Sequence, residues 1–73
     1  MKRYAVVFEK AEHNWSAYVP DLPGCITTGG TLDETKLNIR EAIALHLEAM
    51  EVVGEPIPQP STEVGFIELQ TVA

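Results

Sequence analysis

Few side chains in this 73-residue chain are of a type that could do covalent chemistry. Cys25 is a possible nucleophile, but a thiol is activated only by a nearby cation, base or helix N-terminus. Its neighbours Gly24 and Ile26 carry no charge. We therefore expect Cys25 to be a small buried residue at the start of a strand, not a reactive thiol.

The two histidines lack the neighbours that a metal site or a catalytic base requires. His46 falls within the apolar stripe of a predicted helix, and no Glu-x-x-His or His-x-x-x-His pattern accompanies it. A buried, hydrogen-bonded core or interface histidine is the favoured interpretation, with a general base or metal ligand as the alternative. His13 lies in a polar loop, where solvent exposure is expected. The sequence thus predicts no metal and no cofactor.

The carboxylates do not form a catalytic pair in any obvious way. Asp21 stands between Pro20 and Pro23, where an aspartate more often holds the local backbone of a turn than contacts a ligand. Glu9, Asp21 and Glu34 are the acids that a residual nuclease could use, but no spacing brings them onto one element. The expectation is a protein that is not an enzyme.

Two strands are predicted before Asp21. In residues 4–9, Tyr4, Val6 and Phe8 alternate with Ala5, Val7 and Glu9, and the segment is rich in β-branched and aromatic side chains, a pattern typical of a strand. Residues 10–14 are polar and suit a hairpin loop, and residues 15–19 alternate again as the returning strand. Pro20 cannot donate to a sheet ladder, so the second strand should end there.

A turn and a third strand follow. Pro23 presets φ and Gly24 tolerates positive φ, which together favour a type II turn. Residues 25–28 form a short apolar and β-branched segment that the pair Gly29-Gly30 should end. The sequence therefore predicts a third strand over residues 25–28.

The next segment carries both start and stop signals of a helix. Thr31 and Glu34 form a capping box, in which the Thr31 oxygen accepts from the Glu34 amide and the glutamate reaches back to the Thr31 amide. Gly54 supplies a left-handed C-cap and Pro56 bars continuation. The prediction is a helix over residues 32–53. Its apolar stripe contains Leu32, Ile39, Ile43, Leu47 and Met50.

The C-terminal part contains a connector and a further apolar segment. Prolines at alternate positions in 55–60 favour an extended, polyproline-like connector. Residues 64–72 are apolar and β-branched and predict a final strand. The expected architecture is α+β in the order β-β-β-α-β, with one helix packed on a mainly antiparallel sheet. Residues 1–73 are expected to form a single domain.

The bulk composition limits the possible partners. Five basic residues against eleven acidic ones give a net charge of −6, the wrong sign for a direct nucleic-acid binder. The charge suits a basic protein partner, although solubility alone explains it equally well. No apolar run approaches the roughly 18 residues of a membrane span. A lone cysteine fits a reducing cytoplasm, and so small a domain favours a homodimer or a larger oligomer.

Apolar and aromatic residues outside the main stripe suggest an interface. Leu37, Leu45 and Val52 point away from the stripe and form a second apolar flank, or else are scattered surface residues. Trp15 and Tyr18 lie on opposite faces of their strand, so one should be core and the other exposed. The proposed partner or subunit interface comprises Glu9, Glu12, Trp15, Tyr18, Leu37, Leu45 and Val52.

The ordered set of motifs resembles the HicB-like antitoxin family. The matching residues run through most of the chain and include Tyr4 to Glu9, Trp15 to Cys25, Glu41-Ala-Ile43, His46-Leu47 and Gly54 to Pro58. We regard the central motif as structural, and its residues are Pro20, Asp21, Leu22, Pro23, Gly24, Cys25, Gly29, Thr31, Glu34 and Gly54.

The resemblance carries its own implications. It implies a partly degraded ribonuclease-H-like fold and an antitoxin that blocks HicA, a small basic toxin with a double-stranded-RNA-binding fold that cleaves mRNA. Longer members add a C-terminal DNA-binding domain. Since this chain stops at Ala73, DNA binding is expected to be absent or supplied by another protein. Gly30 and Thr35 depart from the family pattern, which has acidic or polar residues and alanine there.

These observations lead to one main hypothesis and two alternatives. The main hypothesis is a non-enzymatic, cytoplasmic antitoxin-like module that self-associates and neutralises a HicA-like toxin. The first alternative is an orphan oligomeric adaptor with no active toxin, and the second is a residual nuclease. A HicA-like reading frame beside this one would favour the main hypothesis, and Mg²⁺- or Mn²⁺-dependent RNA cleavage would favour the nuclease.

Overall fold

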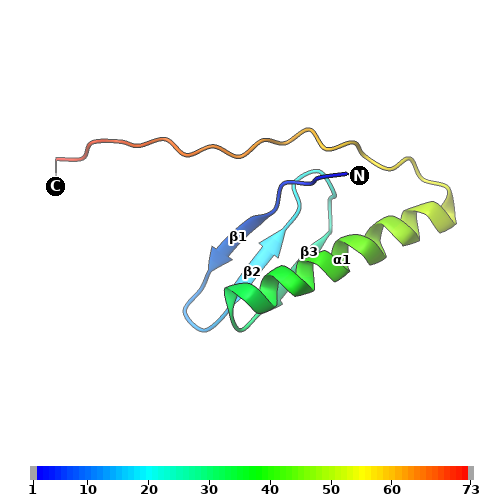
Figure 1. Ribbon diagram of the computed structural model, residues 1–73, viewed down its shortest axis with the longest axis horizontal. Coiled ribbons are helices and arrows are strands. Elements are labelled where there is room, and N and C mark those ends of the chain that lie inside the picture. Colours follow the sequence, from blue (N-terminus) through cyan, green and yellow to red (C-terminus); the bar gives the residue numbers. More distant parts are fainter. Residues whose placement is uncertain (1, 73) are drawn as a thin grey trace.

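A computed structural model describes residues 2–72 and contains one three-stranded sheet and one long helix (Figure 1). The strands are β1 (Val7–Lys10), β2 (Trp15–Tyr18) and β3 (Ile26–Gly29), and the helix is α1 (Leu32–Val53). The sheet is antiparallel in the order β1-β2-β3. The predicted β-β-β-α arrangement is therefore confirmed. In this part of the chain no helix is both long enough and apolar enough to cross a bilayer.

The core lies between the helix and one face of the sheet. Alternation places Ala17 opposite Phe8 on the same face of the sheet, and both pack with residues of α1. The buried apolar residues are Ala17, Val19, Leu22, Cys25 and Ile39. Partly buried residues surround them: Tyr4, Val6, Phe8, Ala42, Ile43 and Leu47. So small a core leaves the stability of the domain marginal.

The first strand is shorter than the predicted range of residues 4–9. The register that pairs Val7 with Tyr18 would place Ala5 opposite Pro20, which has no N–H to donate. The N–H of the preceding residue, Val19, points to the opposite side of the strand and donates to the carbonyl of Cys25 at 3.1 Å. Pairing with β2 therefore starts at Val7, and residues 4–6 approach the core without joining the ladder.

The predicted final strand is wrong in the described part of the chain. Residues 64–72 belong to no strand, and no hydrogen bond is formed beyond Thr62 among residues 2–72. Their side chains are exposed instead of packed, Phe66 by 92%. The β-propensity of the segment is real, but a strand also needs a sheet edge within hydrogen-bonding distance.

Both predicted ends of the helix are confirmed, but the Glu34 side chain binds a different amide from the one predicted. The Glu34 amide donates to Thr31 Oγ1 at 3.1 Å, but the Glu34 carboxylate accepts from the Gly30 amide and not from the Thr31 amide. At the other end Gly54 has φ of 75°, and the Glu55 amide donates to the Met50 carbonyl at 2.9 Å.

The first turn of the helix passes very close to β3. Thr35 is fully buried there, and its hydroxyl donates to the Thr31 carbonyl at 2.7 Å. A Cβ on Gly29 would lie 2.5 Å from Thr35 Oγ1 and 2.9 Å from the Thr35 amide nitrogen. Gly29 is thus part of β3 and not merely its end, and it is required because a helix backbone passes directly over it.

Candidate functional site

The turn between β2 and β3 anchors its own loop in the core. Leu22 donates its N–H to Val19 at 3.1 Å, Cys25 donates to Leu22 at 3.0 Å, and Gly24 takes a φ of 85°. The Leu22 side chain is completely buried. The turn therefore places a buried side chain at one end of the core, and we call it the turn plug.

We predicted that Asp21 holds the local backbone of its turn. It instead binds a distant segment, at Ser61 and Thr62. Oδ2 accepts from the amides of Ser61 and Thr62 at 2.9 and 3.0 Å, and Oδ1 accepts from their hydroxyls at 3.1 and 2.7 Å. These bonds, above all those from the Thr62 amide and hydroxyl, lower the pKa of Asp21 to about 2, although burial opposes the shift. Asp21 is therefore a clasp that holds the connector after α1 against the turn.

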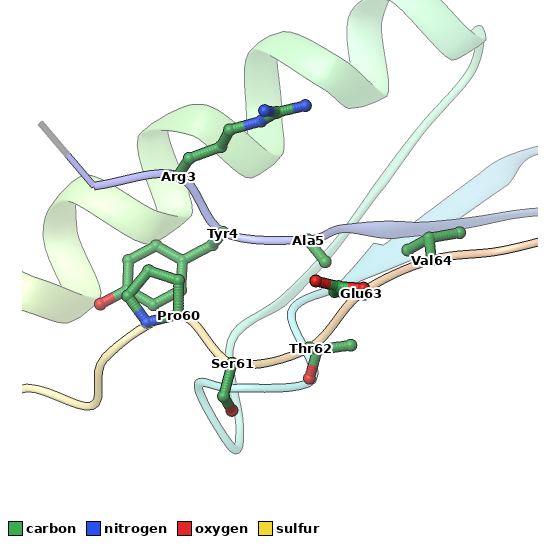
Figure 2. Close-up of a pocket in the computed structure, with 8 residues that line it drawn as sticks. All are labelled: Arg3, Tyr4, Ala5, Pro60, Ser61, Thr62, Glu63 and Val64. Carbon is green, nitrogen blue, oxygen red and sulfur yellow. The ribbon is translucent and has the colours of Figure 1, made fainter.

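A second contact holds the same connector near the N-terminus. The Tyr4 hydroxyl donates to the Pro58 carbonyl. Between the two contacts lies an open groove, shown in Figure 2, whose lining residues are Arg3, Tyr4, Ala5, Pro60, Ser61, Thr62, Glu63 and Val64. Its charged side chains are the Arg3 guanidinium and the Glu63 carboxylate, and its Ser61 and Thr62 hydroxyls donate to Asp21.

The potentially reactive side chains of Cys25, His13 and His46 do not line this groove. Cys25 is buried, and desolvation raises the pKa of its thiol, which favours the unreactive protonated form. His13 is exposed as predicted and lies 3.8 Å from Glu12. His46 is only half-buried on α1, not the buried and hydrogen-bonded residue that the pattern favoured. Across residues 2–72, no cluster of His, Cys, Asp or Glu could hold a metal ion.

The sheet face turned away from α1 carries an apolar row that the sequence reasoning missed. The register places Val7 opposite Tyr18 and Tyr18 opposite Ile26, so one residue from each strand contributes to the row. Tyr18 is 40% exposed and Ile26 is 64% exposed. Glu9 lies on the same face, one pleat away along β1. We call Val7, Glu9, Tyr18 and Ile26 the open sheet face. Alternation identified Tyr18, but only the register shows that Val7 and Ile26 join it.

The structure does not bring all predicted interface residues onto one surface. Trp15 is half-buried and shares the parity of Ala17, so it lies on the side of the sheet that faces the helix. Leu37, Leu45 and Val52 are exposed on the outer side of α1, remote in orientation from the open sheet face. Glu12 lies in the loop between β1 and β2.

Replacing Asp21 by Asn is expected to weaken the clasp, because an amide nitrogen would face N–H and O–H donors. The folded pKa, about 2, lies below the usual 3.8, so the carboxylate contributes stability fully above 3.8 and loses it as the pH falls towards 2. The urea midpoint of Asp21→Asn should be lower than that of the parent at neutral pH, and the two should converge between pH 4 and pH 2. Circular dichroism measures both midpoints.

The matched control is Glu12→Gln, which removes an exposed loop carboxylate. Its midpoint should follow that of the parent chain at every pH. If the urea midpoints of Asp21→Asn and the parent differed by the same amount down to pH 2, this would contradict a role for the negative charge of Asp21.

Comparison with known proteins supplies the biological context of this fold. Residues 4–69 match the model of a family described as the HicB-like antitoxin of bacterial toxin–antitoxin systems. An uncharacterised 14.9 kDa protein of Haemophilus phage HP1 is 41% identical over 64 residues, which cover 88% of this chain and 48% of that protein. A UPF0150 protein of Thermoplasma acidophilum is 39% identical, over 84% of this chain and 90% of that protein.

Two further comparisons involve proteins with a named role. A protein of Photorhabdus laumondii called antitoxin HicB 2 is 32% identical over 92% of this chain and 49% of its own length. A solved structure described as a HicA3 and HicB3 toxin–antitoxin complex contains a chain that superposes with a TM-score of 0.71 at 33% identity. The superposition covers 82% of this chain and 70% of that one. This chain spans about half the length of the phage and Photorhabdus proteins.

Proposed function

The chain belongs to the HicB-like antitoxin family, and from this premise we propose that it binds and neutralises a small basic, HicA-type toxin that cleaves mRNA. The observation that carries the proposal is the structural match, at a TM-score of 0.71 and 33% identity, to a chain from a complex of HicA3 with HicB3. The net charge of −6 agrees with a basic partner, because opposite fields speed and orient the encounter.

The open sheet face is the surface that we assign to the toxin. Tyr18 is an exposed aromatic residue at the middle strand of the sheet, and aromatic residues with this placement are frequent interface anchors. Val7 and Ile26 flank it in register, and Glu9 adds a carboxylate at the border. An apolar centre with a charged rim is the usual organisation of a protein interface. Glu12 lies in the loop after β1 and adds a second carboxylate near that end of the strand.

In this proposal the chain acts by binding alone. The three acids that a residual nuclease could use lie on different parts of the fold. Asp21 accepts hydrogen bonds from Ser61 and Thr62, Glu9 lies on β1, and Glu34 lies on α1. The protected thiol of Cys25 is compatible with the cytoplasm, where a toxin that cleaves mRNA has its substrate. The family match over residues 4–69 supports treating residues 1–73 as one HicB-like domain. We further propose that this domain self-associates and makes no direct contact with nucleic acid.

The test is inhibition of RNA cleavage by a purified HicA-type toxin from the same host. Ile26→Asp should weaken toxin binding at least about 30-fold, because it places a charge in the centre of an apolar contact. The matched control is Leu37→Asp, since Leu37 is 65% exposed and Ile26 is 64% exposed. Leu37→Asp should inhibit the toxin as well as the parent chain. Urea unfolding of both variants separates lost binding from lost structure.

Two outcomes would contradict the proposal in different ways. Loss of inhibition by Leu37→Asp, with Ile26→Asp unaffected, would move the interface to the outer side of α1. Failure of the parent chain to inhibit or bind the toxin would leave the oligomeric adaptor as the better function.

A further inference from the structure

The segment that follows α1 is hydrogen-bonded to the rest of the molecule at two points. We call residues 55–62 the strap. Near its middle the Pro58 carbonyl accepts from the Tyr4 hydroxyl, and at its end the amides and hydroxyls of Ser61 and Thr62 donate to Asp21. Apart from the Glu55 amide, which donates to the end of α1, the strap makes no other hydrogen bond within residues 2–72.

The strap contributes nothing to the buried core. The buried apolar residues lie between Ala17 and Ile39, and the partly buried residues packed on them end at Leu47. No residue of the strap is fully buried. An open groove also lies between the end of the strap and residues 3–5 (Figure 2). The sheet, the turn plug and α1 can therefore keep their packing when the strap leaves.

The strap is stiff, so its two contacts depend on each other. Prolines at positions 56, 58 and 60 fix φ at alternate residues and favour polyproline geometry. Only Gln59 and Pro60 separate Pro58 from Ser61. While one contact holds, it keeps the groups of the other contact near each other at a high effective concentration. Loss of one contact should therefore weaken the other.

We propose that the strap opens and closes as one unit, hinged after Gly54, while the three strands and α1 stay folded. Tyr4 and Asp21 are its two latches. Segments that open locally are held by few contacts and by exposed hydrogen bonds, as the strap is. Opening leaves the Asp21 carboxylate and the Tyr4 hydroxyl without their partners, and therefore free to bond to another molecule. This inference rests neither on toxin binding nor on self-association.

Native-state hydrogen exchange of the full chain, followed by NMR, tests the opening. The Ser61 and Thr62 amides report on the strap, because Asp21 is their acceptor, and the Val19 amide reports on the sheet, because it donates to Cys25. Ser61 and Thr62 should have the same protection factor, at least about 10, and it should be at least about a hundredfold below that of Val19. Protection equal to that of Val19, unequal protection of the two strap amides, or no protection at all would overturn the proposal.

A substitution at the first latch tests whether the two contacts are coupled. Tyr4→Phe removes the hydroxyl that donates to Pro58 but keeps the ring. It should lower the protection of the Ser61 and Thr62 amides about 3- to 10-fold, although neither amide is bonded to Tyr4. The matched control is Tyr18→Phe, which removes a hydroxyl on the open sheet face and should leave both protection factors unchanged. Unchanged protection in Tyr4→Phe would show that the latches act independently and that the strap is not one unit.

A substitution in the core separates strap opening from global unfolding. Ile39→Val removes one methyl group from a side chain that is 3% exposed, and it should lower the protection of the Val19 amide about 2- to 10-fold. The protection of Ser61 and Thr62 should not change, because the open form retains the whole core. If Ile39→Val lowered the protection of all three amides equally, the strap would leave only by global unfolding and the proposal would be wrong.

Discussion

Replacing Leu22 by Ala is expected to lower the free energy of unfolding by about 2–5 kcal/mol, the usual cost of removing a large buried side chain. Leu22 has no exposed surface, and it plugs the end of a core made of few enclosed residues. A chain of this size has a total stability of only about 4–11 kcal/mol. The variant should therefore unfold at a much lower urea concentration than the parent.

The control for this prediction is Leu37→Ala. It deletes the same atoms from a side chain that is 65% exposed, so its effect on the urea midpoint should be small. Equal losses from both substitutions would mean that the turn plug does not contribute to the core. Unfolding followed by circular dichroism measures both variants.

Replacing Gly29 by Ala is expected to cost about 1–3 kcal/mol, because the added methyl group must displace the helix or the strand. Its Cβ would meet Thr35 Oγ1 at 2.5 Å and the Thr35 Cα at 3.0 Å. Backbone atoms cannot rotate away as a flexible side chain can. The urea midpoint should fall, and the first turn of α1 should show faster amide hydrogen exchange.

The adjacent glycine is a matched control for the same substitution. In Gly30→Ala the nearest atom to the new Cβ is a Glu34 carboxylate oxygen at 3.9 Å, an ordinary contact. Gly30→Ala should therefore leave the midpoint close to that of the parent. If Gly29→Ala were equally harmless, the close approach of α1 to β3 would be wrong.

Much of the fold follows from short-range signals in the sequence. The helix was predicted over residues 32–53 and is observed over the same residues, because the cap at Thr31 and the left-handed position at Gly54 are encoded within a few residues of each end. The strands β2 and β3 follow from alternation and from the turn at Gly24. These features depend on residues that are close in sequence, so they can be predicted from the sequence alone.

The candidate site was only partly visible in the same way. Glu9 and Tyr18 were predicted as interface residues, but their grouping with Val7 and Ile26 depends on strand register. Register is a relation between segments, and one residue of slippage would turn every side chain to the other face. Trp15 was placed in the same predicted interface, although it lies on the side that faces the helix.

By itself the sequence determined the capped helix, the strand–turn–strand motif, the acidic charge and the resemblance to a HicB-like antitoxin. The tertiary structure decided which distant groups meet. It joined Asp21 to Ser61 and Thr62, and it showed that Gly29 is needed beneath Thr35. It also left residues 64–72 without a strand partner, despite their strong β-propensity. The physical reason is the same in each case: caps and turns are satisfied locally, whereas clasps, close approaches and strand pairing require a second segment at the right distance.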